Sequence, residues 1–282
     1  MASVQSRVVD QPPMKAKSHF RFLDLPAELR VIIYEEVVVV GKIYYTPDQY
    51  DYHNGIRHLG TFRKPELQFL RVCKQIHSEV EKIYLSKNLF VLPIGWEESG
   101  PFNTSPNRSL FSPAGFHLVK NISIALDQRM SKVKNPLNHL RWKFKENRKG
   151  FLFHRLSADE RLKFAHDWVL DDVFEDWLDT LHQLKQFERV DYIEVDFTNA
   201  FCPLGDCRPI LSVIDGWMFN LAPEVVDVIG LQPGEEIHFD DEHVYGYATT
   251  EHKFDLYFRE PGQVTEWDKW QLEEEDLKKT DV

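Results

Sequence analysis

The sequence predicts an α+β fold in which an N-terminal pair of helices packs on a mixed sheet of alternating strands and helices, as a single compact unit. Three observations predict this class. Apolar residues recur every three or four positions in two segments near the N-terminus, which is typical of amphipathic helices. Short β-branched and aromatic runs alternate with other stretches through the rest of the chain. The 282 residues are 43% hydrophobic and 13% aromatic, which is enough for a sizeable core.

The first predicted helix begins at Leu25-Pro26, because the missing N–H of proline costs nothing at the first helical position. Asp24 is placed to cap this helix, and Glu28 suits the N-terminal end of the helix dipole. Four apolar positions with helical spacing are expected to face a core: Leu29, Ile32, Ile33 and Val37. The valine run 37–40 then favours a strand or a helix end, closed by Gly41.

The second predicted helix follows an irregular or hairpin-like stretch over residues 42–64 and opens at Pro65. Its apolar residues, three or four apart, define one buried stripe: Leu67, Leu70, Cys73, Ile76, Val80 and Ile83. Residues 89–92 predict a short strand that ends at Pro93. Residues 95–115 collect Gly, Pro, Ser and Asn, and they predict a loop.

Four further strand-like stretches follow, at residues 119–126, 190–197, 225–231 and 254–258. The clearest helix covers roughly residues 158–186, where Ser157 and Glu160 form a capping box. This alternation predicts a parallel or mixed sheet with helices on one side. A short, irregular leucine-rich solenoid is the less favoured form, because no fixed repeat period supports it.

The chain divides into four regions by composition. Residues 1–18 are polar and predict a disordered lead-in, and residues 19–93 form the helical N-terminal region. Residues 94–262 are expected to form an α/β recognition region. The segment 263–282 is an acidic tail.

Composition excludes several classes of function. A formal net charge of -11 disfavours general nucleic-acid binding, because phosphates would repel the protein. Three cysteines do not make a disulfide framework. Neither a signal core nor a run long enough to cross a membrane is visible, so we expect a cytoplasmic or nuclear protein. No phosphate-binding glycine loop, nucleophile elbow, zinc-protease motif or dinucleotide fingerprint is present, and we do not expect an enzyme.

Two blocks in the N-terminal region carry a specific combination of residues. The first block contains Leu25, Pro26, Glu28, Leu29, Arg30, Ile33, Tyr34 and Glu35. The second contains Leu70, Arg71, Val72, Cys73, Gln75, Ile76 and Glu79, and is followed by Asn88-Leu89-Phe90. Together with the segment 201–208, these blocks resemble a large fungal family of F-box-like proteins. Lys74 and His77 stand where that family usually has arginines, and Asp206 where it has a cysteine.

The resemblance implies a non-catalytic substrate adaptor of a Cullin-RING ubiquitin ligase that binds a Skp-type adaptor protein. The partner-binding residues would be Leu25, Pro26, Leu29, Ile32 and Ile33. The alternative is a fungal interaction module unrelated to ubiquitin transfer, in which this stripe is only core. The adaptor hypothesis requires Pro26 and Leu29 to be accessible to solvent. The core hypothesis requires them to be buried against Cys73 and Ile76.

Cys202 and Cys207 are the strongest candidates for a metal site, with His238 or His243 as a further zinc ligand. Their spacing of four intervening residues and the lack of a second cysteine pair favour a turn with one buried cysteine instead. The carboxylates in residues 167–179 predict a solvated acidic helix face. We therefore expect no metal and no cofactor.

A basic segment over residues 129–149 interleaves charged and aromatic side chains, among them Arg141, Trp142, Lys143 and Lys145. This composition is used for stacking on single-stranded nucleic acid, and also for nuclear import. An exposed loop that neutralises the acidic helix, or a strand with one basic face, explains the same residues. A nucleic-acid-associated factor is therefore a minor alternative in a chain this acidic.

Overall fold

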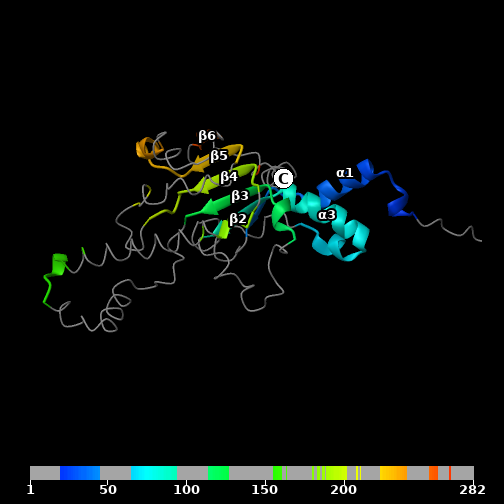
Figure 1. Ribbon diagram of the computed structural model, residues 1–282, viewed down its shortest axis with the longest axis horizontal. Coiled ribbons are helices and arrows are strands. Elements are labelled where there is room, and N and C mark those ends of the chain that lie inside the picture. Colours follow the sequence, from blue (N-terminus) through cyan, green and yellow to red (C-terminus); the bar gives the residue numbers. More distant parts are fainter. Residues whose placement is uncertain are drawn as a thin grey trace, which may run out of the picture.

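The computed structural model describes the parts of the chain that carry the helices, the strands and their junctions (Figure 1). These are residues 20–44, 65–93, 114–126, 155–160, 189–201, 223–239 and 254–259, with positions 163, 180, 183–184, 186–187, 208, 210 and 267. The basic segment 129–149, Cys202, Cys207 and His243 lie outside them. The same holds for the carboxylates of residues 167–179.

The N-terminal region contains two α-helices, each preceded by a short 3-10 helix. η1 (Phe22–Asp24) leads into α1 (Ala27–Val38), and η3 (Leu67–Arg71) leads into α3 (Lys74–Lys87). Pro26 is the N-cap of α1, so the predicted cap at Asp24 is wrong; Asp24 ends η1 instead. The second helix is not continuous, because Cys73 is extended and separates η3 from α3.

Within the described ranges the sheet has six strands, all parallel, and each strand pairs with its neighbours in chain order. The strands are β1 (Lys42–Tyr44), β2 (Leu89–Pro93), β3 (Asn121–Ala125), β4 (Tyr192–Asp196), β5 (Val225–Ile229) and β6 (Asp255–Arg259). Helices in the N-terminal region and the later strands are confirmed as elements, and of the two predicted forms, parallel or mixed, the sheet has the parallel one. The F-box-like character of the helix pair stays a prediction. Of the stretch predicted to be irregular or hairpin-like over residues 42–64, only residues 42–44 are described; they form β1, which runs parallel to β2.

A sheet in chain order is the arrangement in which each unit stacks on the one before it. This is the strand order of a solenoid, which the absence of a sequence repeat had disfavoured. Figure 1 shows β2 to β6 side by side, with α1 and α3 beyond one end of the strands. The segments between strands differ in length, so the strands do not recur at a fixed interval in the sequence. The regular order of the sheet is therefore not visible as a sequence repeat.

One face of the sheet is apolar. Successive side chains of a strand point to opposite faces, so the apolar residues that alternate with polar ones gather on one face. Phe90, Ile122, Ile193 and Val226 align in register across β2 to β5 and are buried. This row belongs to a single core that also takes in side chains of both helices, namely Tyr34, Val38, Ile76, Val80, Ile83, Tyr84 and Leu85. Helices and sheet therefore share one core.

Asn88 connects both helices to the sheet. Its Oδ1 accepts a hydrogen bond of 2.8 Å from the Val40 N–H, and its Nδ2 donates to the carbonyls of Val38 and Tyr84. The side chain is fully buried, so these bonds satisfy polar groups that would otherwise be costly. The chain also needs a left-handed residue between α1 and β1, and Gly41, with φ of 81°, supplies it.

The capping box predicted at Ser157 is confirmed. The Glu160 carboxylate accepts from the Ser157 N–H at 2.8 Å, and the Ser157 hydroxyl accepts from the Glu160 N–H at 3.2 Å. The pKa of Glu160 is lowered by the two hydrogen bonds that its carboxylate accepts, from the backbone N–H and from the hydroxyl of Ser157. Across the described ranges, no helix is both long and apolar enough to span a bilayer.

Candidate functional site

α1 turns polar and aromatic residues inward and aliphatic residues outward. Arg30, Tyr34 and Val38 follow one another at intervals of four, and all three are buried. Leu29 and Ile32 lie on the other side, with 47% and 62% of their surface exposed. An apolar face that remains in water is unusual for a helix packed on a core, and such faces mark binding surfaces.

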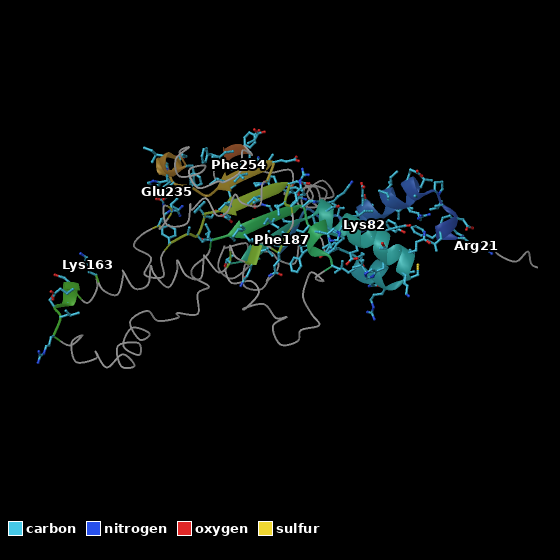
Figure 2. The ribbon with its side chains drawn as sticks, viewed as in Figure 1. Arg21, Lys82, Lys163, Phe187, Glu235 and Phe254 are labelled. Atoms are coloured by element: carbon cyan, nitrogen blue, oxygen red, sulfur yellow. The ribbon has the colours of Figure 1, made fainter. Side chains whose placement is uncertain are left out.

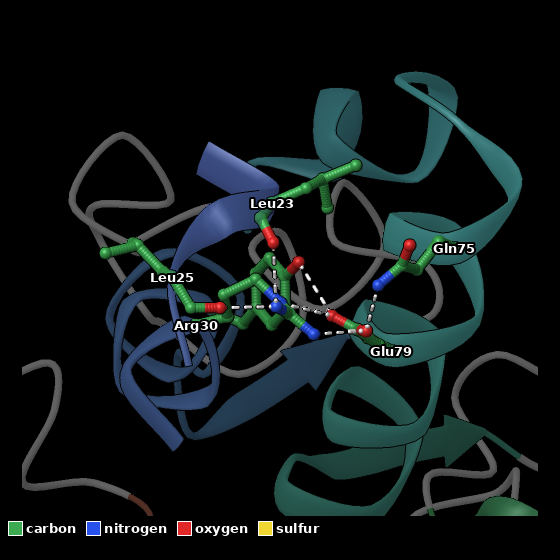
Figure 3. A network of polar contacts seen from close by, with 6 residues as sticks. Leu23, Leu25, Arg30, Gln75 and Glu79 are labelled. Carbon is green, nitrogen blue, oxygen red and sulfur yellow. Dashed lines mark hydrogen bonds and ion pairs between the residues drawn. The ribbon is translucent and has the colours of Figure 1, made fainter. Parts of the chain in front are cut away.

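Glu79 of α3 explains why Arg30 points inward (Figure 3). The guanidinium donates to both carboxylate oxygens, through Nε at 3.0 Å and through Nη2 at 2.9 Å. This bidentate geometry is the strongest form of an arginine–carboxylate pair. Arg30 Nη1 also donates to the backbone carbonyls of Leu25 at 2.6 Å and Leu23 at 3.4 Å. One side chain therefore joins α1, α3 and the segment that enters α1.

Two more side chains complete the group, which we call the Glu79 cluster: Arg30, Tyr34, Gln75 and Glu79. The Tyr34 hydroxyl and Gln75 Nε2 each donate to Glu79 at 3.0 Å. The hydrogen bonds from Arg30 and Gln75 lower the pKa of Glu79 to about 2. Burial and the Glu79 carboxylate raise the pKa of Tyr34 to about 12. The cluster therefore keeps Glu79 ionised and Tyr34 protonated at neutral pH.

Aromatic packing around Tyr34 fixes α1 further. The rings of Phe22 and Phe69 lie 5.6 Å and 6.4 Å from the Tyr34 ring, measured between centroids. Phe22 belongs to η1 and Phe69 to η3, so both short helices contact the inner side of α1. With its inner side held from both flanks, α1 presents its opposite side in one orientation.

That opposite side carries the residues predicted to bind a partner. We call them the outer face: Leu25, Pro26, Leu29, Ile32 and Ile33. Leu25 is half-buried and the other four are exposed. The expectation that Leu29, Ile32 and Ile33 face a core is therefore wrong, because the Glu79 cluster takes the inward side of α1. Cys73, expected in a buried stripe, is exposed as well.

The remaining site predictions fall largely outside the described residues. Arg141, Trp142, Lys143 and Lys145 lie there, as do Cys202, Cys207 and His243. His238 is described and ends the short helix η7 (Glu235–His238). No cluster of three metal-ligating side chains occurs within the part of the chain that the structure describes.

Sequence reasoning missed a buried row of charges on the second face of the sheet. Glu194 of β4 accepts a hydrogen bond of 2.7 Å from Ser123 of β3, and the Lys42 ammonium lies 3.3 Å from its other oxygen. The two side chains must together span β2 and β3, because both of these strands lie between β1 and β4. Both charges are almost fully buried, so each depends on the other.

A second set of contacts continues this row at β5. The Asp227 carboxylate is fully buried and accepts hydrogen bonds of 2.6 Å from the Tyr192 hydroxyl and from Arg259 Nε. Burial and the carboxylates of Glu194 and Asp227 raise the pKa of Tyr192. The sequence signal was present, since Glu194 and Asp227 are the central residues of their strands and each stands between two β-branched apolar residues. The charges are balanced, and each of these contacts joins two different strands, which supports a role in fixing strand order.

The outer face therefore has the features of a binding site, and the described contacts of the charged row are structural. No family model matches the chain, and neither a curated protein nor a solved structure shows significant similarity to it.

Proposed function

We propose that this chain is a non-catalytic protein–protein interaction protein that binds a Skp-type adaptor through the outer face of α1, as an F-box-like substrate adaptor of a Cullin-RING ubiquitin ligase. The observation that carries this proposal is the orientation of α1. Its aliphatic residues Leu29, Ile32 and Ile33 are exposed, whereas Arg30, which lies between Leu29 and Ile32 in the sequence, is buried.

The spacing of the outer face supports recognition by a groove. Leu29, Ile32 and Ile33 stand at positions i, i+3 and i+4, which is how an amphipathic helix places anchors in an apolar groove. Transfer of each aliphatic side chain from water into such a groove is favourable by about 1.5–3 kcal/mol when burial is complete. The Glu79 cluster orients the helix in advance, so little ordering entropy opposes binding.

The two sequence blocks then have separable roles. Arg30, Tyr34, Gln75 and Glu79 hold the helices together, and the outer face offers the contact surface. The α/β region that follows would present the surface that recognises a substrate. Because the five residues of the outer face are apolar and uncharged, we expect a protein partner at this site.

The experiment is binding of the purified full chain to the fungal Skp-type adaptor, measured by isothermal calorimetry and by co-elution. The test variant is Leu29→Asp/Ile32→Asp, which places two charges on the outer face. The matched control is Ile237→Asp, because Ile237 is 75% exposed and lies on η7, whose first residue, Glu235, is far from Arg21 at the α1 end of the structure (Figure 2). Circular dichroism checks that all three proteins fold.

We expect the parent and the control to bind with equal affinity, and the double variant to bind about 100-fold or more weakly, since two buried anchors are lost. A parent chain that shows no heat and no co-elution at micromolar concentration overturns the adaptor role. A folded double variant that binds as well as the parent overturns the assignment of the outer face.

A further inference from the structure

Among the described strands, β6 is the last in the sheet and forms one of its edges. In the part of the chain that the structure describes, β6 pairs only with β5. Tyr257 and Phe258 point to opposite faces of the sheet, yet 51% and 44% of their surfaces are exposed. Figure 1 places β6 at the margin of the sheet. An exposed, apolar edge strand is a template for pairing with another strand.

The direction of the backbone groups on β6 follows from its pairing with β5. Asp255 N–H donates to the Glu224 carbonyl at 3.0 Å, so the backbone groups of Asp255 face β5. Backbone groups alternate between the two sides of a strand, which turns those of Tyr257 and Arg259 toward β5 as well. The N–H and C=O groups of Leu256 and Phe258 therefore point outward, away from the sheet.

The sequence of β6 is complementary to itself when two copies run antiparallel. Its five residues are Asp-Leu-Tyr-Phe-Arg. A register centred on Tyr257 places Asp255 opposite Arg259 of the second copy, at both ends of the pair. The same register places Leu256 opposite Phe258 of the second copy, and these are the residues whose backbone groups point outward. Charges, aromatic rings and backbone groups are all matched by this single alignment.

We infer that β6 pairs antiparallel with β6 of a second copy of this chain, so that the two sheets join into one continuous sheet. The contact is isologous, with residue i opposite residue j in both directions, as twofold symmetry requires. Leu256 and Phe258 exchange backbone hydrogen bonds with their opposite partners in the narrow, reciprocal pairs of an antiparallel ladder. The two Tyr257 side chains meet at the symmetry axis, where aromatic cross-strand pairs are favourable.

Arg259 is already positioned for this contact. Its Nε and Nη2 groups lie 2.6 Å from Asp227 Oδ2, which holds the side chain on the face shared with Asp255. About a quarter of the Arg259 side chain remains accessible, so the guanidinium can also reach a carboxylate from a second copy. An unrelated extended peptide would need an acidic residue opposite Arg259 and a basic one opposite Asp255. A second copy supplies both in the required order.

The experiment is sedimentation velocity with light scattering on the full chain, from about 1 to 100 µM. We expect the parent to reach twice the 33.3 kDa chain mass as concentration rises. Asp255→Arg places two arginines opposite each other at both ends and is expected to weaken self-association at least tenfold. Asp159→Arg makes the same change of charge at an exposed position on another element, and is expected to dimerise like the parent.

Mixing two variants tests the register itself. Asp255→Arg and Arg259→Glu are each expected to be monomeric, whereas their equimolar mixture restores both ion pairs and is expected to form a heterodimer. Arg259→Glu also removes the cationic partner of Asp227 and can therefore prevent folding. A second pair of variants, at Phe258, tests the same contact without changing Arg259. Phe258→Pro removes one outward N–H, and Phe258→Val keeps it while shortening the side chain. We expect only the proline variant to lose the dimer.

Three results overturn the inference. One is a parent chain that stays monomeric up to 100 µM. Another is a folded Asp255→Arg variant that dimerises like the parent. The third is a Phe258→Pro variant that dimerises as well as Phe258→Val, since the edge hydrogen bonds would then carry no part of the contact.

Discussion

Glu79 is the residue on which the N-terminal helix pair depends most. Its two carboxylate oxygens accept four hydrogen bonds, two from Arg30, one from Tyr34 and one from Gln75. All four residues belong to the two sequence blocks that resemble the F-box-like family. Their residue types therefore have a structural reason that is independent of any partner. The guanidinium of Arg30, the hydroxyl of Tyr34 and the side-chain amide of Gln75 all donate hydrogen bonds to the Glu79 carboxylate.

The stability that Glu79 contributes should depend on pH. Its pKa falls from 4.5 to about 2 on folding, so its contribution is complete above pH 4.5 and is lost as the pH falls toward 2. Glu79→Gln should therefore lower the free energy of unfolding by about 2 kcal/mol at pH 7, and by clearly less at pH 3. Urea unfolding at both pH values measures this.

The control for this experiment is Glu28→Gln, which neutralises an exposed carboxylate in the first turn of α1. It should change stability by no more than about 0.5 kcal/mol. An equal loss for Glu79→Gln at pH 7 and pH 3 would show that ionisation of Glu79 does not stabilise the fold.

At the scale of elements, the strands were predictable and the burial of α1 was not. β2 to β6 coincide with runs of β-branched and aromatic residues, which the sequence displays locally. The inward side of α1 depends on an ion pair between Arg30 and a residue 49 positions further along the chain. Helical spacing alone assigns Leu29 and Ile32 to the core, because aliphatic residues are normally buried and arginine is not. The candidate residues were therefore identifiable, but their exposure was not.

Strand order could not be predicted for a related reason. Local patterns locate β3 and β4, but they do not indicate which strand lies beside which. The buried charges on the second face help to determine which strands are neighbours. Glu194 contacts Ser123 and Lys42. Asp227 contacts Tyr192 and Arg259. These partners lie between 32 and 71 positions apart in sequence for the hydrogen-bonded pairs. Only the folded structure brings them together.

The turn after β5 provides a prediction with an internal control. Gly230 and Gly234 both have positive φ, at 75° and 92°. A Cβ on Gly230 would lie 2.3 Å from the Thr198 backbone nitrogen, whereas a Cβ on Gly234 would meet nothing within 4 Å. Gly234→Ala should cost about 1 kcal/mol from backbone strain. Gly230→Ala should cost about 3 kcal/mol, because the turn must also move. Equal losses in thermal unfolding would contradict the close approach to Thr198.

The whole molecule is organised around one core that helices and sheet share. Tyr34 and Val80 from the helices belong to the same buried cluster as Phe90 and Ile193 from the strands. Among the described residues, a separate buried cluster contains only Val91 and Ala125 of the sheet. A substitution that destabilises the helix pair is therefore expected to destabilise the sheet as well, and the reverse. The outer face keeps its orientation only while the sheet is folded.

Cooperative unfolding tests this organisation. Val80 is fully buried in α3, and Val80→Ala should lower the free energy of unfolding by about 2 kcal/mol. Because the core is shared, the transitions followed by far-ultraviolet circular dichroism and by tryptophan fluorescence should move together. Two separated transitions, with only one of them shifted, would show that the helix pair and the sheet are independent units.

The order of the strands has a consequence for how this chain can change over evolutionary time. Each of the six described strands pairs with its neighbours in chain order, so this order requires no connection to cross a strand. The connection from β3 to β4 covers residues 126–191, while that from β5 to β6 covers only 230–254, and both deliver the next strand to the adjacent position. Insertions and deletions between strands therefore leave the sheet register intact. Divergence in length among descendants of this sequence should concentrate in those connections, while strand length stays nearly constant.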